Sequence, residues 1–498
     1  MTAFPFDNSY ARLPEKFFSR VAPTPVAAPA LIAVNRPLAK QLGIDPDWLA
    51  SAEGVAVVAG NALPEGAEPI ATVYAGHQFG SYNPQLGDGR AVLLGEVVNP
   101  SGNRLDVQLK GAGPTPYSRG GDGRSPLGPV LREYLLSEAM HTLGIPSTRA
   151  LAAVTTGDEV VREEFLPGAI LARVASSHIR IGTFQFFSAS QDNEALAQLL
   201  QHVAVRHFPE ALVSDNLALG VLHAVINAQA RLVAKWQLVG FIHGVMNTDN
   251  MLLSGETIDY GPCAFMDTFK PDMVYSSIDH AGRYAYRNQP GIAHWNLACL
   301  AQSLVPLLHE DKDEGVALAQ QAIDTFPETF VQAHTLGMAS KLGLRPTSEE
   351  SGEAQDGKLV EDLFALMAQH DCDFTLTFRR LADLAGSEPD GAGSIGSLFE
   401  IPDPMLPWLS RWRARLDSEP AAAAANRQSE MYRANPVFIP RNHLVQEVIE
   451  AATADRDLDP FHQLAQVLAR PCRFDASLSR YARPPDPEQV VRHTFCGT

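Results

Sequence analysis

Cysteines, long apolar runs and basic residues are all scarce in this sequence of 498 residues. Its five cysteines lie far apart and none forms a C-x-x-C pair, which argues against a zinc site or a dense disulfide framework. No stretch approaches the roughly 18 consecutive apolar residues that a spanning helix needs, and the amino terminus lacks a basic start followed by an apolar run. These absences predict a cytoplasmic protein that does not associate with membranes.

The charge balance is strongly acidic. The chain has 57 acidic and 39 basic residues, giving a formal net charge of -18. A protein that binds nucleic acid needs net positive charge along the phosphate backbone, so we expect no nucleic-acid partner. A small polyanion could still bind in a cleft that is locally basic.

The length and the residue patterns predict two lobes, because a single core rarely exceeds roughly 250–300 residues. Short β-like runs occupy 71–110 and 150–175, the latter with a predicted turn at 156–158, and a helical pattern covers 129–145. Helical patterns then dominate at 193–205, 216–239, 292–308 and 314–335, with polar surface linkers expected at 345–358 and 386–396. We therefore predict an α+β fold with a β-rich lobe at 1–188 and a helical lobe at 189–498, the order found in bilobal protein kinases.

The segment 240–261 gives the strongest chemical signal. "MLL" and "TIDY" flank a Ser-Gly-Glu turn, which predicts a short hairpin that brings Asn250 close to Asp259. An amide oxygen and a carboxylate suit Mg²⁺, a hard ion that binds a few protein oxygens together with phosphate oxygens. Asp259-Tyr260-Gly261 then corresponds to the Asp-Phe-Gly motif of protein kinases.

The proton acceptor departs from the kinase pattern. Kinases place a catalytic aspartate five residues before the metal-binding asparagine, and that position here is Val245, which cannot accept a proton. Asp249, directly before Asn250, is the available replacement.

A strand lysine and a helix glutamate are expected to pair near the phosphates, as in kinases. Lys110 ends the β-like run "LDVQLKG", and the helix at 129–145 offers Glu133 and Glu138. A helical wheel favours Glu138, because that residue lies among leucines on the interior face. The residue pattern alone leaves the choice open.

Glycines and arginines predict a phosphate-binding loop. Gly87, Gly89 and Arg90 lie at a strand-turn-strand junction, where glycine backbone N–H groups can approach phosphates and the arginine adds a bidentate donor. Further candidates are Asp122 and Gly123 in a second glycine-rich loop, and then Arg173 and Arg180. Together with Lys110, these residues would hold a nucleoside triphosphate.

The chain resembles the selenoprotein O family, also called the YdiU or UPF0061 family. The resemblance rests on "YAGHQFGSYNPQLGDGRA", "VQLKGAGPTPYSR", "GDGRSPLGPVLREYLLSEAMHTLGIPSTRAL", "HGVMNTDNM" and "IDYGPCAFMD" and extends from about residue 4 to the end. It implies a pseudokinase-like fold that binds ATP in a reversed orientation and transfers AMP to hydroxyl groups of proteins. Uridylylation with Mn²⁺ is also attributed to some members, so ATP or UTP with Mg²⁺ or Mn²⁺ are the implied nucleotides and metals.

The resemblance also assigns roles to individual residues. It makes Lys110 the phosphate-binding lysine with Glu133 as its helix partner, against the helical wheel, and Asp249 the proton acceptor. It implies metal binding by Asn250 and Asp259, and nucleotide contacts by Gly87, Gly89, Arg90, Asp122, Gly123, Arg173, Arg180 and Asp259.

The last cysteine adds a redox hypothesis. Many eukaryotic relatives carry selenocysteine at the third residue from the end, where this chain has Cys496. Cys263 follows the Asp259-Tyr260-Gly261 motif, and a disulfide between the two would tie the tail across the mouth of the site. Unpaired thiols are the alternative, and they are the default in a cytosolic protein.

Two other functions stay open at this point. One is a kinase, for a small molecule or a protein, that transfers the γ-phosphate. The other is a nucleotide-binding scaffold without catalysis, suggested by Val245. We expect a monomer, although nothing in the sequence reports on assembly.

Overall fold

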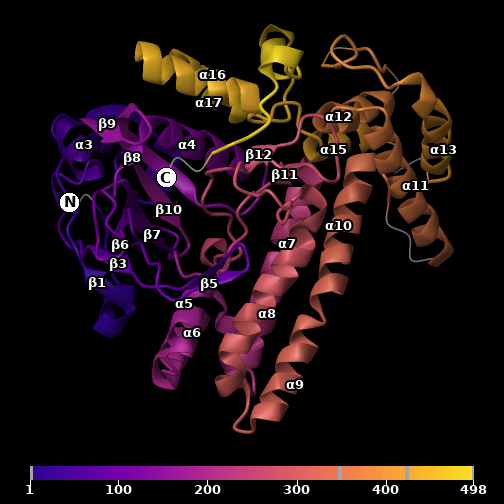
Figure 1. Cartoon of the computed structure of the whole chain (residues 1–498). Coiled ribbons are helices and arrows are strands. Elements are labelled where there is room, and N and C mark those ends of the chain that lie inside the picture. The colour runs from indigo at the N-terminus through magenta and orange to yellow at the C-terminus, as the bar shows by residue number, and fades with distance from the viewer. Residues whose placement is uncertain (1–3, 346–349, 387, 392, 421–424, 496–498) are drawn as a thin grey trace.

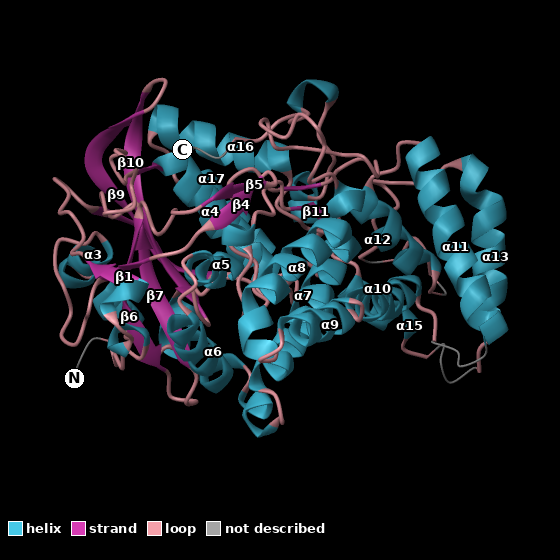
Figure 2. Cartoon of the chain, turned by 60° about the horizontal axis from the view of Figure 1, so that its bottom comes forward, coloured by secondary structure: helices cyan, strands magenta, loops and turns pink. Residues whose placement is uncertain are grey.

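The computed structural model describes residues 4–345, 350–386, 388–391, 393–420 and 425–495. A β-sheet makes up most of the amino-terminal part and helices make up the rest, so the mixed α+β prediction is confirmed (Figures 1 and 2). The predicted boundary, residue 188, lies inside helix α5, Ile181–Ala189.

The main sheet is antiparallel, with the strand order β1-β3-β6-β7-β10-β9-β2 and with β8 paired to β10. In chain order its strands are β1 Phe18–Arg20, β2 Ala30–Val34, β3 Ile70–Thr72, β6 Ala91–Val98, β7 Arg104–Lys110, β8 Ser125–Pro126, β9 Arg149–Val161 and β10 Phe165–Ala175. Two-stranded ribbons are formed by β4 Gly76–Gln78 with β5 Ser81–Asn83, and by β11 Phe241–Ile242 with β12 Ala264–Phe265. The pairing places Lys110, the last residue of β7, opposite Ala91 and Leu171 in the interior of the sheet.

Helices cover both faces of this sheet. Three short helices pack on one face: α1 Arg36–Gln41, α2 Pro46–Leu49 and α3 Ala52–Val58. The long helix α4, Leu127–Thr142, packs on the other face and contacts β9 and β10. This matches the helix predicted at 129–145, and the chain leaves it through Gly144 in a left-handed conformation, φ +74°.

The helical part begins with α5 and continues with α6 Asn193–His207, α7 Leu217–Val239, α8 Gln289–Leu308, α9 Lys312–Ile323 and α10 Phe326–Leu342. It continues with α11 Glu350–Gln369, α12 Phe374–Leu384, α13 Leu406–Asp417, α15 Arg427–Ala434, α16 Asn442–Glu450 and α17 Asp459–Leu468. The last two return to the sheet part and pack on α4, where they lie above it in Figure 1.

Three local predictions were wrong. The helix predicted at 314–335 is two helices, because Pro327 lacks the N–H that a continuous helix needs and instead sits in the first turn of α10. The turn predicted at 156–158 lies at 162–164, since β9 continues through Gly157 at an irregularity in its pairing with β10. The linker predicted at 345–358 is helical from Glu350 onward. By contrast, the linker predicted at 386–396 is loop or turn at all of its described residues, which exclude 387 and 392.

Two helical segments have the length and mean hydropathy of a candidate membrane span, Leu217–Val239 and Tyr286–Leu308, which the count of consecutive apolar residues did not indicate. In the most apolar 18-residue stretch of each, about half is buried inside the protein, 56% and 50% respectively. Core helices of soluble proteins have the same character, so both are compatible with a soluble protein.

Candidate active site

The segment after α7 forms a buried turn that presents Asp249 and Asn250. Helix α7 ends at Gly240, whose φ of +70° turns the chain into β11, and one 3-10 turn follows at Thr248–Asn250. In place of the predicted hairpin, one isolated β-bridge joins Met251 to Thr257. The two strands do not pair further there, because the backbone of Leu252 pairs with Arg180 instead. His243 connects the two sides of this segment through its contact with the carbonyl of Ile258, 2.9 Å away.

Asp249 is buried, and one of its carboxylate oxygens is left without a partner. Gln78 donates to Oδ2 at 3.1 Å, and Arg180 donates to the backbone carbonyl of Asp249 at 2.7 Å. The other oxygen, Oδ1, is enclosed and has no hydrogen-bond partner among the described residues. Burial raises the pKa of Asp249 to about 6, although Gln78 and Arg180 oppose the shift. A carboxylate in this state can accept a proton at Oδ1.

A network of buried charges lies at the end of β7. The Lys110 ammonium is 2.5 Å from Glu133 of α4 and 3.1 Å from Asp259, and Arg173 of β10 is 3.1 Å from the other oxygen of Glu133. Burial alone would raise the pKa of Asp259, yet Lys110, Arg90 and Arg173 hold that pKa well below its usual range. Asp259 therefore stays ionised at any physiological pH.

The structure pairs Lys110 with Glu133, so the helical wheel that favoured Glu138 was misleading. Glu138 binds Arg149 at 2.8 and 2.7 Å and accepts a hydrogen bond from the backbone N–H of Ala150. The wheel failed because α4 is buried against the sheet on one side and against α16 and α17 on another, so an interior position need not face Lys110.

The glycine loop between β5 and β6 is tightly packed. Gly87 has a φ of +83°, and a Cβ there would lie 2.4 Å from the ring of Tyr117. Between the two glycines, Asp88 is buried and accepts hydrogen bonds from the N–H and the hydroxyl of Thr72. Arg180 approaches Asp88 at 3.5 Å, which connects this loop to the turn that carries Asp249.

The second glycine-rich loop has its own set of contacts. Asp122 is 42% exposed at its side chain and binds Arg162 at 2.9 Å, while Gly123, φ +64°, packs against the backbone of Gly113. Within the described ranges, no hydrogen bond or ion pair joins Asp122 to the network around Lys110. The structure therefore joins Lys110, Glu133, Arg173, Arg180, Asp249 and Asp259 in one region, and the contact of Asp122 with a nucleotide stays a prediction.

Asn250 and Asp259 have the chemistry to bind a divalent metal ion. The amide nitrogen of Asn250 donates to the carbonyl of Val245 at 3.0 Å, so its amide oxygen is available as a ligand. The described residues contain no group of three or more His, Cys, Asp or Glu side chains that could form a metal cage. A site with two protein ligands, completed by phosphate oxygens and water, is the arrangement that Mg²⁺ favours, so these residues fit the ion.

Cys263 is buried, and burial raises the pKa of its thiol to about 12. Thr494, near the carboxyl terminus, donates to the carbonyl of Pro262 at 2.5 Å, so the tail lies beside this segment. Cys496 itself falls outside the described residues, and the disulfide stays a prediction.

Sequence reasoning missed Gln78 and Asp88, although both lie in the quoted stretch at 74–91. The position of a buried acid between two glycines could have indicated Asp88, whereas nothing in the sequence singles out Gln78.

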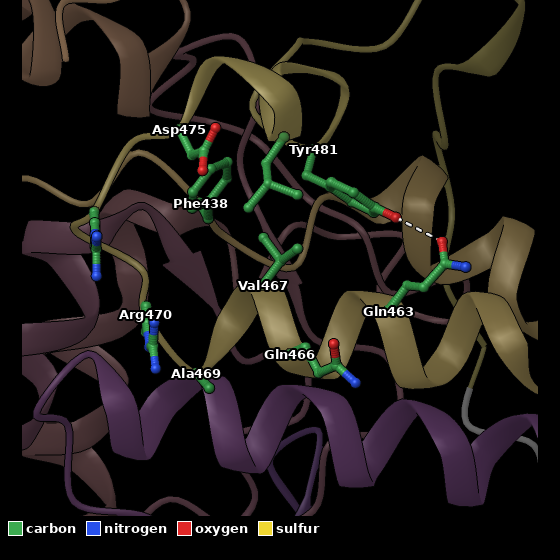
Figure 3. A pocket seen from close by; sticks show the side chains of 10 residues that line it. Phe438, Gln463, Gln466, Val467, Ala469, Arg470, Asp475 and Tyr481 are labelled. Atoms are coloured by element: carbon green, nitrogen blue, oxygen red, sulfur yellow. Dashed lines mark hydrogen bonds between the residues drawn. The ribbon is translucent and has the colours of Figure 1, made fainter. Parts of the chain in front are cut away.

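A separate cavity of about 680 Å³ lies between α17 and the segment that follows it (Figure 3). Phe438, Val467 and Tyr481 line it, and Tyr481 bonds to Gln463 at 3.0 Å. None of its lining residues belongs to the network around Lys110 or to the turn at Asp249, so we do not include it in the site.

Comparison with known proteins decides the family. A family model described as protein adenylyltransferase SelO matches residues 1–469. The chain belongs to the SelO family. Proteins named protein nucleotidyltransferase YdiU are 58% identical in Rhodopseudomonas palustris strain BisB5, over 99% of both chains, and 57% identical in Bradyrhizobium sp. strain BTAi1, over the same shares. This SelO-family chain is therefore a nucleotidyltransferase.

Proposed function

We propose that this chain transfers AMP from ATP to hydroxyl groups of protein side chains and releases pyrophosphate. The observation that carries the proposal is the placement of an unpartnered carboxylate oxygen, Oδ1 of Asp249, in one site with the cations around Asp259. The name of the family model and the names of the relatives support nucleotidyl transfer to proteins.

The charges around Asp259 divide between holding the metal and holding phosphates. Asn250 and Asp259 would bind Mg²⁺ or Mn²⁺, which when bound neutralises phosphate charge. Lys110 and Arg173, which are both bound to Glu133, supply positive charge beside Asp259. Preorganised cations of this kind stabilise charge that develops on the leaving pyrophosphate. We include Gly87, Gly89 and Arg90 as nucleotide contacts, with Arg180 linking their loop to Asp249.

The reaction needs one proton acceptor. The acceptor hydroxyl gives its proton to Oδ1 of Asp249 while its oxygen attacks the α-phosphorus. The new O–P bond forms as the bond from that phosphorus to the bridging oxygen breaks, and the electron pair leaves with pyrophosphate. Gln78 donates to Oδ2 and so leaves Oδ1 free to accept the proton.

The wider setting of the site is part of the same proposal. We propose two kinase-like lobes, 1–188 and 189–498, with the site between them, and contacts of Asp122 and Gly123 to the nucleotide. We propose a monomer located in the cytoplasm. The location is supported by Cys263, Cys299, Cys372 and Cys472, which are all unpaired thiols, as expected in a reducing compartment. UTP with Mn²⁺ is a second nucleotide and metal pair to test.

The deciding experiment labels ATP at the α- or the γ-position. The protein is incubated with each label, Mg²⁺ or Mn²⁺, and bulk cell protein. We expect label on protein from the α-position alone. Label from the γ-position would establish a kinase instead, and no label from either position would leave a nucleotide-binding scaffold.

A further inference from the structure

The β4–β5 ribbon folds over the turn that carries Asp249. Three consecutive residues of the ribbon bond to three consecutive residues of the turn. The bonds run from the N–H of His77 to the hydroxyl of Thr248 at 2.7 Å, from the amide of Gln78 to Asp249 at 3.1 Å, and from the N–H of Phe79 to Oδ1 of Asn247 at 3.1 Å. These bonds hold the ribbon in a fixed position against Asp249, the proposed proton acceptor. Its outer side is therefore a fixed surface next to that residue.

The tip of the ribbon is held in a strained conformation. Its two-residue turn places Phe79 at φ +51° and Gly80 at φ +84°, and a phenylalanine is rare in that region. The Phe79 ring packs on Tyr284 with the ring centres 5.1 Å apart, and the Tyr284 hydroxyl donates to Asn247 at 2.7 Å. Such strain persists where surrounding contacts fix it, and it concentrates at functional sites.

A cation and exposed aromatic rings lie next to this ribbon. The Arg283 guanidinium lies 4.8 Å from the ring centre of Trp295, and the ring of His77 lies 5.0 Å from Tyr82 and 5.2 Å from Trp295. Tyr82 is 40% exposed and Trp295 36%. We refer to His77, Tyr82, Arg283 and Trp295 as the acceptor patch.

Arg283 is short of negative charge. No carboxylate lies within 4.0 Å of its guanidinium in the described ranges, and its buried Nε has no hydrogen-bond partner there. Asp279 is close along the chain, but its two oxygens accept the backbone N–H groups of Arg283 and Tyr284. An arginine without an acid partner is a ready binding point for a carboxylate from another molecule.

We propose that the acceptor patch binds the segment of a protein substrate that carries the target hydroxyl, with an acidic side chain of that segment on Arg283 and an apolar one on Trp295 and Tyr82. The inference rests on the proposed function, because it supplies the acceptor for Asp249. With a net charge of -18, the protein as a whole repels acidic segments, so a local cation is needed to hold one. Arginine, tryptophan and tyrosine are also the residues that dominate binding energy at protein interfaces.

The test uses two fluorescein-labelled peptides that each contain Ser, Thr and Tyr, flanked in one by Asp and in the other by Lys. Fluorescence anisotropy gives their affinities, and α-labelled ATP gives transfer to each. We expect wild type to bind and label the Asp peptide at least about tenfold better, and Arg283→Glu to reverse that preference. Arg283→Lys should keep it, and Trp295→Ala should weaken the binding of both peptides.

Arg287→Glu is the matched control, because this substitution makes the same change in net charge as Arg283→Glu. Arg287 is 62% exposed at its side chain and pairs with Asp272. It should leave the preference unchanged, and ATP affinity measured by calorimetry should stay within about twofold of wild type in every variant. Equal preference in wild type and Arg283→Glu, an equal shift in Arg287→Glu, or loss of ATP binding in Arg283→Glu would each overturn the patch as an acceptor site. If peptide binding depends on Arg283 but no label is transferred, the patch stands and the proposed function fails.

Discussion

Glutamine in place of Glu133 removes the charge that joins Lys110 to Arg173 while it keeps the size of the side chain. Glu133 is 3% exposed and lies 2.5 Å from Lys110 and 3.1 Å from Arg173. Both cations would then have Asp259 as their remaining acid nearby, and Lys110 already lies 3.1 Å from it. We expect Lys110 to bind Asp259 more closely and to compete there with the metal ion.

The size of the effect follows from the burial of the pair. Removing one partner of a buried ion pair costs about 3–5 kcal/mol. Each 1.36 kcal/mol corresponds to about tenfold in rate, so the full cost acting on the transition state would give about 10²–10⁴-fold. We therefore expect kcat/KM for AMP transfer in Glu133→Gln to fall by about 10²–10⁴-fold, with a higher metal requirement.

Glu138→Gln on the same helix is the control. Its partner Arg149 lies outside the network, and we expect transfer within about threefold of wild type together with a modest loss of stability. The assay compares initial rates of α-label transfer across a Mg²⁺ titration for the two variants. The reasoning is refuted if Glu138→Gln loses as much activity as Glu133→Gln, or if Glu133→Gln transfers at the wild-type rate.

Four further changes test separate parts of the structure. Asp259→Asn should abolish metal-dependent transfer, because the charged metal ligand is lost; a rate near that of wild type at saturating Mg²⁺ would contradict the site. Asp249→Asn should slow transfer by roughly 10²–10⁴-fold with ATP affinity intact, and a collapse of ATP binding in calorimetry would make Asp249 a ligand instead of the base. Gly76→Ala places a Cβ 2.4 Å from Oδ1 of Asp249, so transfer should fall by about tenfold or more while ATP still binds, and unchanged rates would contradict that packing. Burial lowers the pKa of Lys341 to about 7, whereas the unfolded chain keeps its lysines near 10.4, so the unfolded state binds more protons between these values and stability should rise with pH by about 1.4 kcal/mol per unit. Lys341→Met should remove that slope, which urea unfolding at pH 7 and pH 9 measures, and an equal slope in both proteins would contradict the shift.

The sequence alone determined the elements whose residue pattern repeats locally. The apolar run at 91–98 is β6, the pattern at 129–145 is α4 within three residues at each end, and the pattern at 216–239 is α7. Periodicity and end signals such as Gly144 and Gly240 depend on neighbours in the chain, which is why they can be read without a fold. The motif at 240–261 likewise drew attention to Asp249, Asn250 and Asp259.

Only the tertiary structure decided which side chains meet. Glu133 is buried and Glu138 is half-buried on the same helix, and the position of α4 between the sheet and α17 determines that Glu133 reaches Lys110. Gln78 meets Asp249 across 171 positions of the chain, and no local pattern reports on such a contact. Packing between distant segments determines these pairs, because burial forces each charged or polar group to find a partner wherever the fold supplies one.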